Sequence, residues 1–287
     1  MYLDTIEKKL SAMINLKKEN DYLDYDINQL NKLTTYSGIW ELKFNDHLFK
    51  MINISNDDLV PLKYFWKDKY EQFSLNLWYL FTREIDAIHI DVGSHTGIYT
   101  IIGNLNKEIC NIISLEPYYI NYSRMISNLK LNKMYLNNSF LWAASNESGI
   151  AKFKTETDIG RHTSGGSIQQ DGNHEVNKIK LDDIDIGNLK VSSIKIDTEG
   201  HEYEVLLGSE NIIKNFKPQI IFEINETAAQ KCINFLTKYN YTFFMIDDLK
   251  NKLRPLNENN NKVKLGIEGV NCLATPFPED NLFSKYI

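Results

Sequence analysis

The sequence predicts a doubly wound α/β fold with a mostly parallel sheet, preceded by an N-terminal extension. From residue 85 onward, short apolar runs alternate with amphipathic stretches of about ten or more residues, the pattern of repeated βαβ units. Glycine and charged residues follow several of these runs directly, where ligands bind in open α/β sheets. The chain has 287 residues and is 43% hydrophobic, so it can bury such a core. We therefore expect residues 85–287 to form the main domain.

Residues 1–84 are predicted to form a helix, a hairpin and an aromatic-rich helical segment. The first 35 or so residues are polar, with apolar residues at helical spacing. Two alternating runs, 38–44 and 47–53, flank Asn45-Asp46 and indicate a hairpin. The stretch 61–81 carries aromatic residues at helical intervals, and we expect these rings to pack in a core rather than to form a ring-binding box.

The main domain is predicted to alternate strands and helices, with one insertion. The insertion covers about 149–184: two runs, 149–156 and 175–184, alternate like antiparallel strands and flank a glycine-rich loop. That loop is either a lid or a plain exposed connection. Strands are predicted at 87–92, 111–116, 138–144, 192–197, 218–224, 241–246 and 269–275, and helices at about 97–106, 119–132, 201–215 and 226–239.

Composition excludes several classes of protein. Lys and Arg number 32 against 38 Asp and Glu, which makes duplex nucleic acid a poor partner. Cys110, Cys232 and Cys272 lie far apart with no CxxC spacing, so neither a disulfide framework nor a thiolate zinc site is expected. No run approaches the roughly 18 apolar residues of a membrane span, and the N-terminus lacks an apolar signal core. We expect a soluble, cytoplasmic protein.

The first βα junction of the main domain reads IHIDVGSHTGIYT and predicts a nucleotide-type cofactor site. Gly93 and Gly97 allow the backbone to turn sharply against a ligand, with Ser94 and His95 between them. Asp91 ends the strand, where a carboxylate can hold the ammonium group of S-adenosylmethionine (SAM), directly or through water. A dinucleotide loop usually reads GxGxxG, so this spacing favours SAM over NAD.

The second signal is Glu116, which ends the next predicted strand 25 residues after Asp91. A carboxylate at this point can accept hydrogen bonds from both ribose hydroxyls. Tyr118 could pack its ring on adenine, or simply cap the surface. The ordered combination of both signals predicts SAM as the cofactor.

The third signal is SIKIDTEGHE, which brings Lys195, Asp197, Glu199 and Glu202 to the carboxyl edge of the sheet. A structural explanation is open for each residue: Lys195 could pair with a carboxylate, and Glu202 could cap the following helix. Together these charges favour a functional site. Asp197 is also a candidate contact of the cofactor.

These blocks resemble the FkbM-type methyltransferase family, whose pattern is DVGxxxG, then EP, then KIDxEGxE. The sequence matches it at 91–97, 116–117 and 195–202, and the resemblance covers about 85–250. Glu223 looks like the glutamate that the family carries on its fifth strand, whereas His95 replaces a frequent asparagine. The resemblance implies a Rossmann-like class I methyltransferase fold, SAM, and methyl transfer to oxygen in natural-product, sugar or glycan biosynthesis.

Two designs could remove the proton of an acceptor hydroxyl. In the first, a side chain is the general base, and the candidates are Asp197, Glu199 and His201. Together with Lys195, these residues of the segment 195–202 are the candidate catalytic residues. His162 on the glycine-rich loop could also close over the substrate.

In the second design, a divalent cation held by Asp197, Glu223 and Asn225 lowers the hydroxyl pKa. We do not favour a metal here. A structural network joining Lys195 to Glu223 would explain the same residues.

The motifs do not identify the acceptor of the methyl group. We expect a small-molecule or glycan acceptor, and we favour a sugar hydroxyl over a polyketide because sugars stack on aromatic rings such as Trp40, Trp66 and Trp78. The same region could form a homodimer contact. The competing functions are a nicotinamide-dependent reductase, which lacks support in its glycine loop, a SAM-binding subunit without turnover, and a nucleic-acid methyltransferase, which the acidic charge disfavours.

Overall fold

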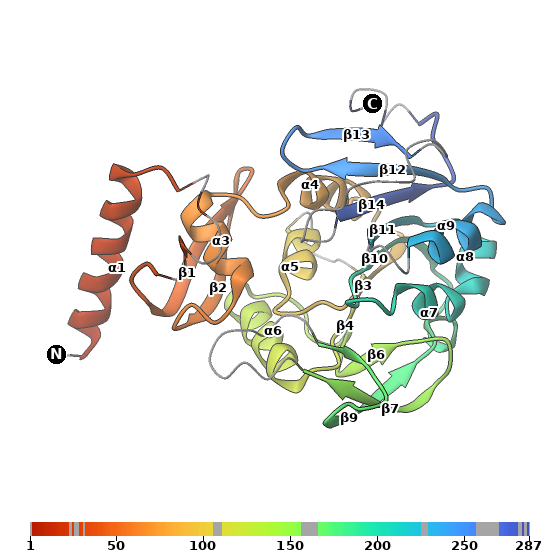
Figure 1. Ribbon diagram of the computed structural model, residues 1–287, viewed down its shortest axis with the longest axis horizontal. Coiled ribbons are helices and arrows are strands. Elements are labelled where there is room, and N and C mark those ends of the chain that lie inside the picture. Colours follow the sequence, from red (N-terminus) through yellow and green to blue (C-terminus); the bar gives the residue numbers. More distant parts are fainter. Residues whose placement is uncertain are drawn as a thin grey trace.

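The N-terminal segment contains a hairpin, as predicted, with α-helices before and after it in the chain (Figure 1). The computed structural model describes residues 2–22, 25, 29–30, 32–105, 111–155, 166–224, 229–256, 270–280, 283 and 286. The elements of this segment are α1 (Tyr2–Glu19), β1 (Ser37–Phe44), β2 (His47–Ile54), α3 (Leu59–Lys67) and α4 (Gln72–Phe81). The aromatic stretch therefore forms two helices rather than one, because Asp68 and Glu71 between them adopt left-handed backbone conformations, with φ of 55° and 41°.

The main sheet has eight strands in the order β13-β12-β14-β11-β10-β3-β4-β5. Strands β11, β10, β3, β4 and β5 pair in parallel, whereas β14 runs antiparallel between β11 and β12, and β13 antiparallel beside β12. The predicted mostly parallel α/β sheet is confirmed. Its strands are β3 (Ala87–Val92), β4 (Ile112–Leu115), β5 (Ser139–Phe140), β10 (Lys190–Ile196), β11 (Gln219–Ile224), β12 (Thr242–Asp247), β13 (Lys252–Pro255) and β14 (Val270–Thr275).

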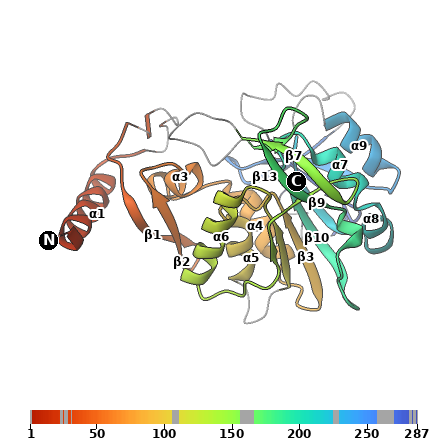
Figure 2. The same cartoon turned by 90° about the horizontal axis from the view of Figure 1, so that it is seen from below.

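Helices cover both faces of this sheet (Figures 1 and 2). Helices α4, α5 (Ile98–Asn104) and α6 (Tyr119–Leu131) pack in one core cluster, and α7 (Glu202–Leu207), α8 (Glu210–Phe216) and α9 (Ala229–Thr237) in the other. The single helix predicted at 201–215 is wrong: the chain breaks at Gly208, where a Cβ atom would lie 1.9 Å from the carbonyl oxygen of Ser145. The carbonyl oxygen of Gly208 accepts a hydrogen bond from the N–H of Asp182, and the Asp182 carboxylate accepts from the N–H groups of Asn211 and Ile212, so α8 starts with a cap of its own.

A second, four-stranded sheet has the order β6-β9-β7-β8 and contains the predicted insertion. Strands β7 and β9 pair antiparallel, as expected. The strand predicted at 138–144 is divided, since β5 belongs to the main sheet and β6 to the second one. Alternation shows that both halves are strand-like but does not show that they change partners. The strands are β6 (Trp142–Ala144), β7 (Gly149–Lys154), β8 (Ser167–Ile168) and β9 (His174–Ile179), and a 3₁₀ turn, η1 (Leu181–Asp183), follows.

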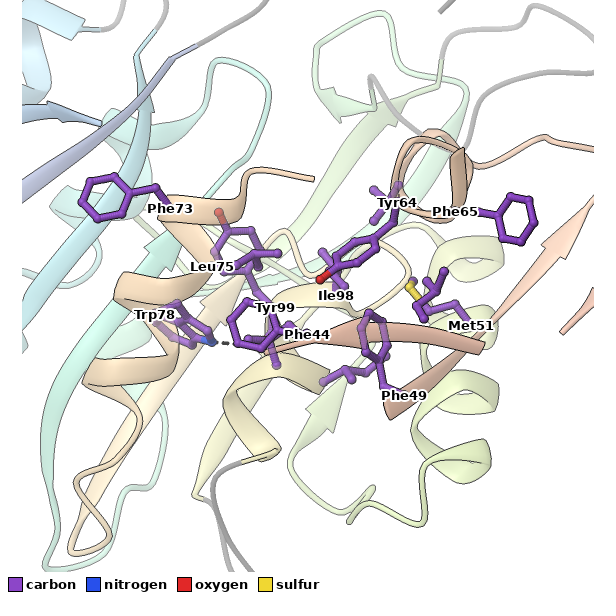
Figure 3. Packing of buried hydrophobic residues seen from close by; sticks show 14 of the residues in the cluster. Phe44, Phe49, Met51, Tyr64, Phe65, Phe73, Leu75, Trp78, Ile98 and Tyr99 are labelled. Atoms are coloured by element: carbon purple, nitrogen blue, oxygen red, sulfur yellow. Dashed lines mark hydrogen bonds between the residues drawn. The ribbon is translucent and has the colours of Figure 1, made fainter. Parts of the chain in front are cut away.

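The N-terminal segment packs directly on the main sheet. One hydrophobic cluster joins Phe44, Phe49 and Trp78 to Ile98 and Tyr99 of α5 (Figure 3). Within it the indole Nε1 of Trp78 donates a hydrogen bond to the carbonyl oxygen of Tyr99 at 2.8 Å (Figure 3). The division of the chain at residues 84 and 85 stays a prediction.

Three further expectations concern the tryptophans, the cysteines and membrane spans. The predicted core role of the aromatic rings is confirmed, since Trp40, Trp66 and Trp78 are at most 2% exposed, and these rings therefore cannot stack on a sugar. Cys232 and Cys272 are buried free thiols, while Cys110 lies outside the described residues. Among the helices described, none combines the length and apolar character needed to cross a membrane.

Candidate functional site

A pocket opens at the carboxyl ends of β3, β4 and β10, with a volume of about 1210 Å³ including its mouth. The pocket brings together most of the predicted site residues, although they come from three separate motifs. Those that line it are Gly93, Ser94, His95, Glu116, Tyr118, Lys195, Asp197, Glu199 and His201. Asp91 and Gly97 are not among its lining residues.

Gly93 makes the closest backbone approach in this pocket. Its φ is +72°, and a Cβ atom there would lie 1.7 Å from the carbonyl oxygen of Asp197. The backbone N–H groups of Gly93 and Ser94 both donate to the carbonyl oxygen of Leu115, at 2.9 and 3.0 Å. The loop after β3 is thus fixed against both neighbouring strands. Gly97, with φ of +96°, starts α5 close to the side chain of Met125.

Asp91 lies beneath this loop rather than on the pocket wall. Its side chain is buried and accepts a hydrogen bond of 2.6 Å from the hydroxyl of Thr100. Burial raises the pKa of Asp91, against the opposing effects of Thr100 and of the Lys195 charge. Asp91 therefore orders the first turn of α5, and its direct contact with a ligand ammonium stays a prediction.

Glu116 is held by the backbone on either side of it. Its Oε2 accepts from the N–H of His95 and its Oε1 from the N–H of Tyr118, both at 2.9 Å. Burial raises the pKa of Glu116, while His95 and these hydrogen bonds oppose the shift. Each carboxylate oxygen has a second lone pair, so a pair of neighbouring hydroxyls could still be bound.

The Tyr118 ring stands beside the inserted sheet. It stacks on Phe153 of β7, with ring centroids 6.3 Å apart and an interplanar angle of 24°. Trp142 and Phe153 line the same end of the pocket. This end is therefore aromatic and apolar.

At the other end, Lys195 pairs with Asp197. The ammonium lies 3.0 Å from Asp197 Oδ2 and 4.6 Å from the centroid of the Tyr99 ring. Burial disfavours the charge of Lys195, but Asp197, Glu71 and Asp91 outweigh it and raise the pKa of the lysine. Lys195 thus remains charged, and its pairing with a carboxylate is the structural role considered from the sequence.

Glu202 and His201 have different surroundings. Glu202 is fully buried, and its Oε1 accepts from Thr198 N, Thr198 Oγ1 and Gly200 N at 3.0 to 3.1 Å, which fixes the loop after β10. The Nε2 atom of His201 lies 3.0 Å from Ser145 Oγ. Burial lowers the pKa of His201, so the imidazole is neutral near pH 7.

The residues weighed for a metal form no metal-binding group in the part of the chain that the structure describes. No group of three His, Cys, Asp or Glu side chains there is arranged to hold a metal ion. Glu223 is not among the pocket lining, and Asn225 and His162 lie outside the described residues.

Sequence reasoning missed the contribution of the N-terminal segment. Leu59, Val60 and Lys63 of α3, and Tyr70 just before α4, line the pocket together with the three motifs. No local pattern marks these residues, because their position depends on how α3 packs against the main domain. The described part of the inserted loop also contributes, at Gly166, Ser167 and Ile168.

A family model described as the methyltransferase FkbM domain matches residues 91–256, more than half of the chain. The chain belongs to the FkbM methyltransferase family. Membership of this family implies SAM as the cofactor, and the Rossmann-like, class I fold expected from the resemblance agrees with the strand order of the main sheet. No curated protein matches the chain.

Solved structures with a similar course of the chain are distant in sequence. The methyltransferase FkbM of Methylobacillus flagellatus KT is 14% identical, with a TM-score of 0.43, and the match covers 75% of this chain and 52% of that one. The chain therefore spans about half of that protein's length. Precorrin-6y C5,15-methyltransferase of Geobacter metallireducens GS-15 is 15% identical, with a TM-score of 0.41, and the match covers 71% of this chain and 87% of that one. A putative methyltransferase of Streptococcus mutans in complex with SAH is 8% identical, with a TM-score of 0.40, and the match covers 70% of this chain and 96% of that one.

Proposed function

We propose that this methyltransferase transfers the methyl group to a hydroxyl oxygen of a small molecule, with a sugar or glycan hydroxyl as the preferred acceptor. The observation that carries the proposal is that Glu116 and the Lys195–Asp197 pair line one pocket and come from the strands on either side of β3. One end suits a nucleoside, and the other places carboxylates and an imidazole where an acceptor can lose a proton.

The lining residues suit SAM. Glu116 would bind the ribose hydroxyls, and the aromatic end at Tyr118 and Trp142 would accept adenine. The tight turn at Gly93 leaves room for the ligand beside the backbone. When bound, SAM supplies a methyl group already activated for transfer by the positive charge on its sulfur.

Among the three candidates for the general base, Glu199 is the best placed. Asp197 is already engaged, because its Oδ2 accepts a hydrogen bond from the Lys195 ammonium at 3.0 Å. A neutral His201 has one acceptor nitrogen, and with Glu204 Oε2 3.7 Å from Nδ1, that acceptor is Nε2, which faces Ser145. Glu199 lines the pocket, and its carboxylate has no hydrogen-bond partner among the described residues.

The acceptor class rests on different residues from those first considered. With Trp40, Trp66 and Trp78 in the core and the end at Tyr118 and Trp142 assigned to adenine, the half-buried ring beside the charged end of the pocket is Tyr70. A half-buried ring beside carboxylates suits a polyol, because sugars combine apolar C–H faces with hydroxyls. A polyketide hydroxyl is the alternative acceptor, and a SAM-binding subunit without turnover is the alternative function.

Calorimetric titration of SAM, SAH and NADH, followed by transfer of a radiolabelled methyl group to a panel of sugars and nucleotide sugars, tests the proposal. We expect Glu116→Ala to weaken SAM and SAH binding at least about tenfold, since two charge-assisted hydrogen bonds are lost. The control is Glu175→Ala, an exposed glutamate on β9. Binding of NADH alone would contradict the proposed site, and turnover only on a non-sugar hydroxyl would contradict the acceptor class.

A further inference from the structure

The segment connecting α3 to α4 reaches the charged end of the pocket in a strained conformation. Asp68 and Glu71, at either end of it, have φ of 55° and 41°. A left-handed conformation costs a non-glycine residue about 1 kcal/mol or more, and such strain tends to collect at binding sites. Tyr70, next to Glu71, lines the pocket.

Glu71 is the point at which this segment is held to the main domain. Its Oε2 accepts hydrogen bonds from the hydroxyl of Tyr99 at 2.7 Å and from the amide of Asn271 at 2.9 Å. The hydroxyl of Tyr70 also bonds to the Glu71 carboxylate. Helix α5 and strand β14 thus fix the position of Glu71, and Glu71 fixes the position of Tyr70.

The Tyr70 hydroxyl donates a hydrogen bond to Glu71, and its oxygen can accept a hydrogen bond from a ligand in the pocket. Burial, followed by the charges of Glu71 and Asp197, raises its pKa well above the ordinary value for tyrosine. The hydroxyl therefore stays protonated and donates a hydrogen bond to the Glu71 carboxylate. Its oxygen still has lone pairs, which can accept from a ligand N–H.

Lys195 complements Tyr70 at the same end of the pocket. One of its N–H groups is directed to Asp197 and the ammonium lies over the Tyr99 ring. An ammonium group has three donors, so Lys195 can also donate to a carboxylate. A hydrogen-bond acceptor and a fixed cation that line the same pocket match the ammonium and carboxylate of an amino acid.

The order of the strands assigns the two ends of the ligand. Strand β3 lies between β4, which carries Glu116, and β10, which carries Lys195. With ribose at Glu116, adenine fits the aromatic end near Tyr118 and Trp142, and the charged end of the ligand fits the side of β10.

We propose that Tyr70, positioned by Glu71, and Lys195 form the subsite for the amino-acid end of SAM and SAH, so that the N-terminal segment outside the family model completes the cofactor site. The proposal rests on the cofactor site described above, with Glu116 as the ribose carboxylate. Tyr70 accepts from the ligand ammonium, and Lys195 donates to the ligand carboxylate.

Calorimetry on the full chain with two ligands tests this subsite: SAH, and methylthioadenosine, which has the nucleoside and the sulfur but no amino-acid end. We expect Tyr70→Phe to weaken SAH about tenfold and to change methylthioadenosine by less than about twofold. Glu71→Gln should show the same selectivity with a loss of about fivefold, because it loosens Tyr70 without touching the ligand. Tyr64→Phe is the control, since its hydroxyl bonds to the Lys43 carbonyl away from the pocket.

The outcomes separate this subsite from the cofactor site as a whole. Equal weakening of both ligands by Tyr70→Phe, or of neither, would overturn the subsite while Glu116→Ala still defines the nucleoside end. Failure of the unmodified protein to bind either ligand would overturn the cofactor site, and the subsite with it. Thermal denaturation of each variant shows whether the fold is retained.

Discussion

Asp248 caps the N-terminus of α4 by accepting hydrogen bonds from both the backbone N–H and the hydroxyl of Ser74, each at 2.8 Å. The N–H of Phe73 donates to the same carboxylate, also at 2.8 Å. Asp248 follows β12, near the edge of the main sheet. The cap therefore joins the N-terminal segment to the far end of the methyltransferase sheet.

We expect Asp248→Ala to lower the free energy of unfolding by about 1–2 kcal/mol, the cost of removing a helix cap. Urea unfolding near pH 7.5 is the measurement, because burial raises the pKa of Asp248 to about 6 and the carboxylate is ionised there. Asp86→Ala, at an exposed position, should change stability by less than about 0.5 kcal/mol. Equal effects of the two substitutions would show that the cap contributes nothing.

Substitution of Gly93, in the loop after β3, can be compared with substitution of Gly187, a glycine with a similar backbone conformation but open surroundings. Both have positive φ, 72° and 60°, but a Cβ atom at Gly93 would meet the Asp197 carbonyl at 1.7 Å, whereas at Gly187 it meets nothing within 4 Å. We expect Gly187→Ala to cost about 1 kcal/mol from backbone conformation alone. Gly93→Ala should cost about 3 kcal/mol or more and abolish SAH binding, because β10 must move away. Similar thermal shifts in the two variants would contradict the close approach.

Most of the sheet could be predicted because its strands are apolar runs separated by amphipathic helices. The alternation located β3 at 87–92 and the hairpin at β1 and β2 within a residue. The errors lie where partner choice or tertiary contact decides. Phe140 and Trp142 lie in one continuous strand-like run of the sequence but belong to different sheets. Strand β13 was missed because only one of its residues, Leu253, is buried, so its sequence shows no apolar pattern.

The cofactor motifs were found because glycine, carboxylate and strand ends occur in a fixed order. The wall of the pocket was not, since Tyr70 and Glu71 gain their positions from Tyr99 and Asn271, the second of them 200 residues away from Glu71. Single residues that only tertiary packing brings together show no characteristic spacing in the sequence, so no motif could predict them.

Glu223 makes stability depend on pH. Burial, together with the charges of Asp197 and Glu199, raises its pKa to about 8. The folded protein therefore keeps a proton that the unfolded chain loses near its ordinary pKa of 4.5. Since the native state binds more protons, this group stabilises the fold at low pH, and that contribution is lost as the pH rises from about 4.5 to about 8.

Glu223→Gln removes this dependence because its amide is neutral throughout. We expect the unmodified protein to lose about 1–2 kcal/mol relative to Glu223→Gln between about pH 5 and pH 8.5, a value reduced because the side chain is partly exposed. Urea unfolding of both proteins across that range is the measurement. Parallel stability curves would mean that Glu223 is ionised in the folded protein.

Asn128 on α6 and Asn132 at the C-cap of the same helix, one turn later, allow a buried hydrogen-bond bridge to be compared with a partly exposed one. The Asn128 side chain accepts from the N–H of Ile52 and donates to the carbonyl of Thr96, both at 2.8 Å, and so ties the edge of β2 to the glycine loop. Asn132 makes an equivalent pair of bonds to Lys50, at 2.8 and 2.7 Å, but is partly exposed.

Water can replace the Asn132 bonds but not the buried Asn128 bridge. Asn128→Ala should therefore cost about 2–3 kcal/mol in urea unfolding, and Asn132→Ala about 0.5–1 kcal/mol. Because Thr96 belongs to the loop that lines the cofactor pocket, Asn128→Ala should also weaken SAH severalfold in calorimetry, with Asn132→Ala unchanged. Loss of stability without any loss of SAH affinity would show that the hairpin supports the fold but does not hold the glycine loop in its binding conformation.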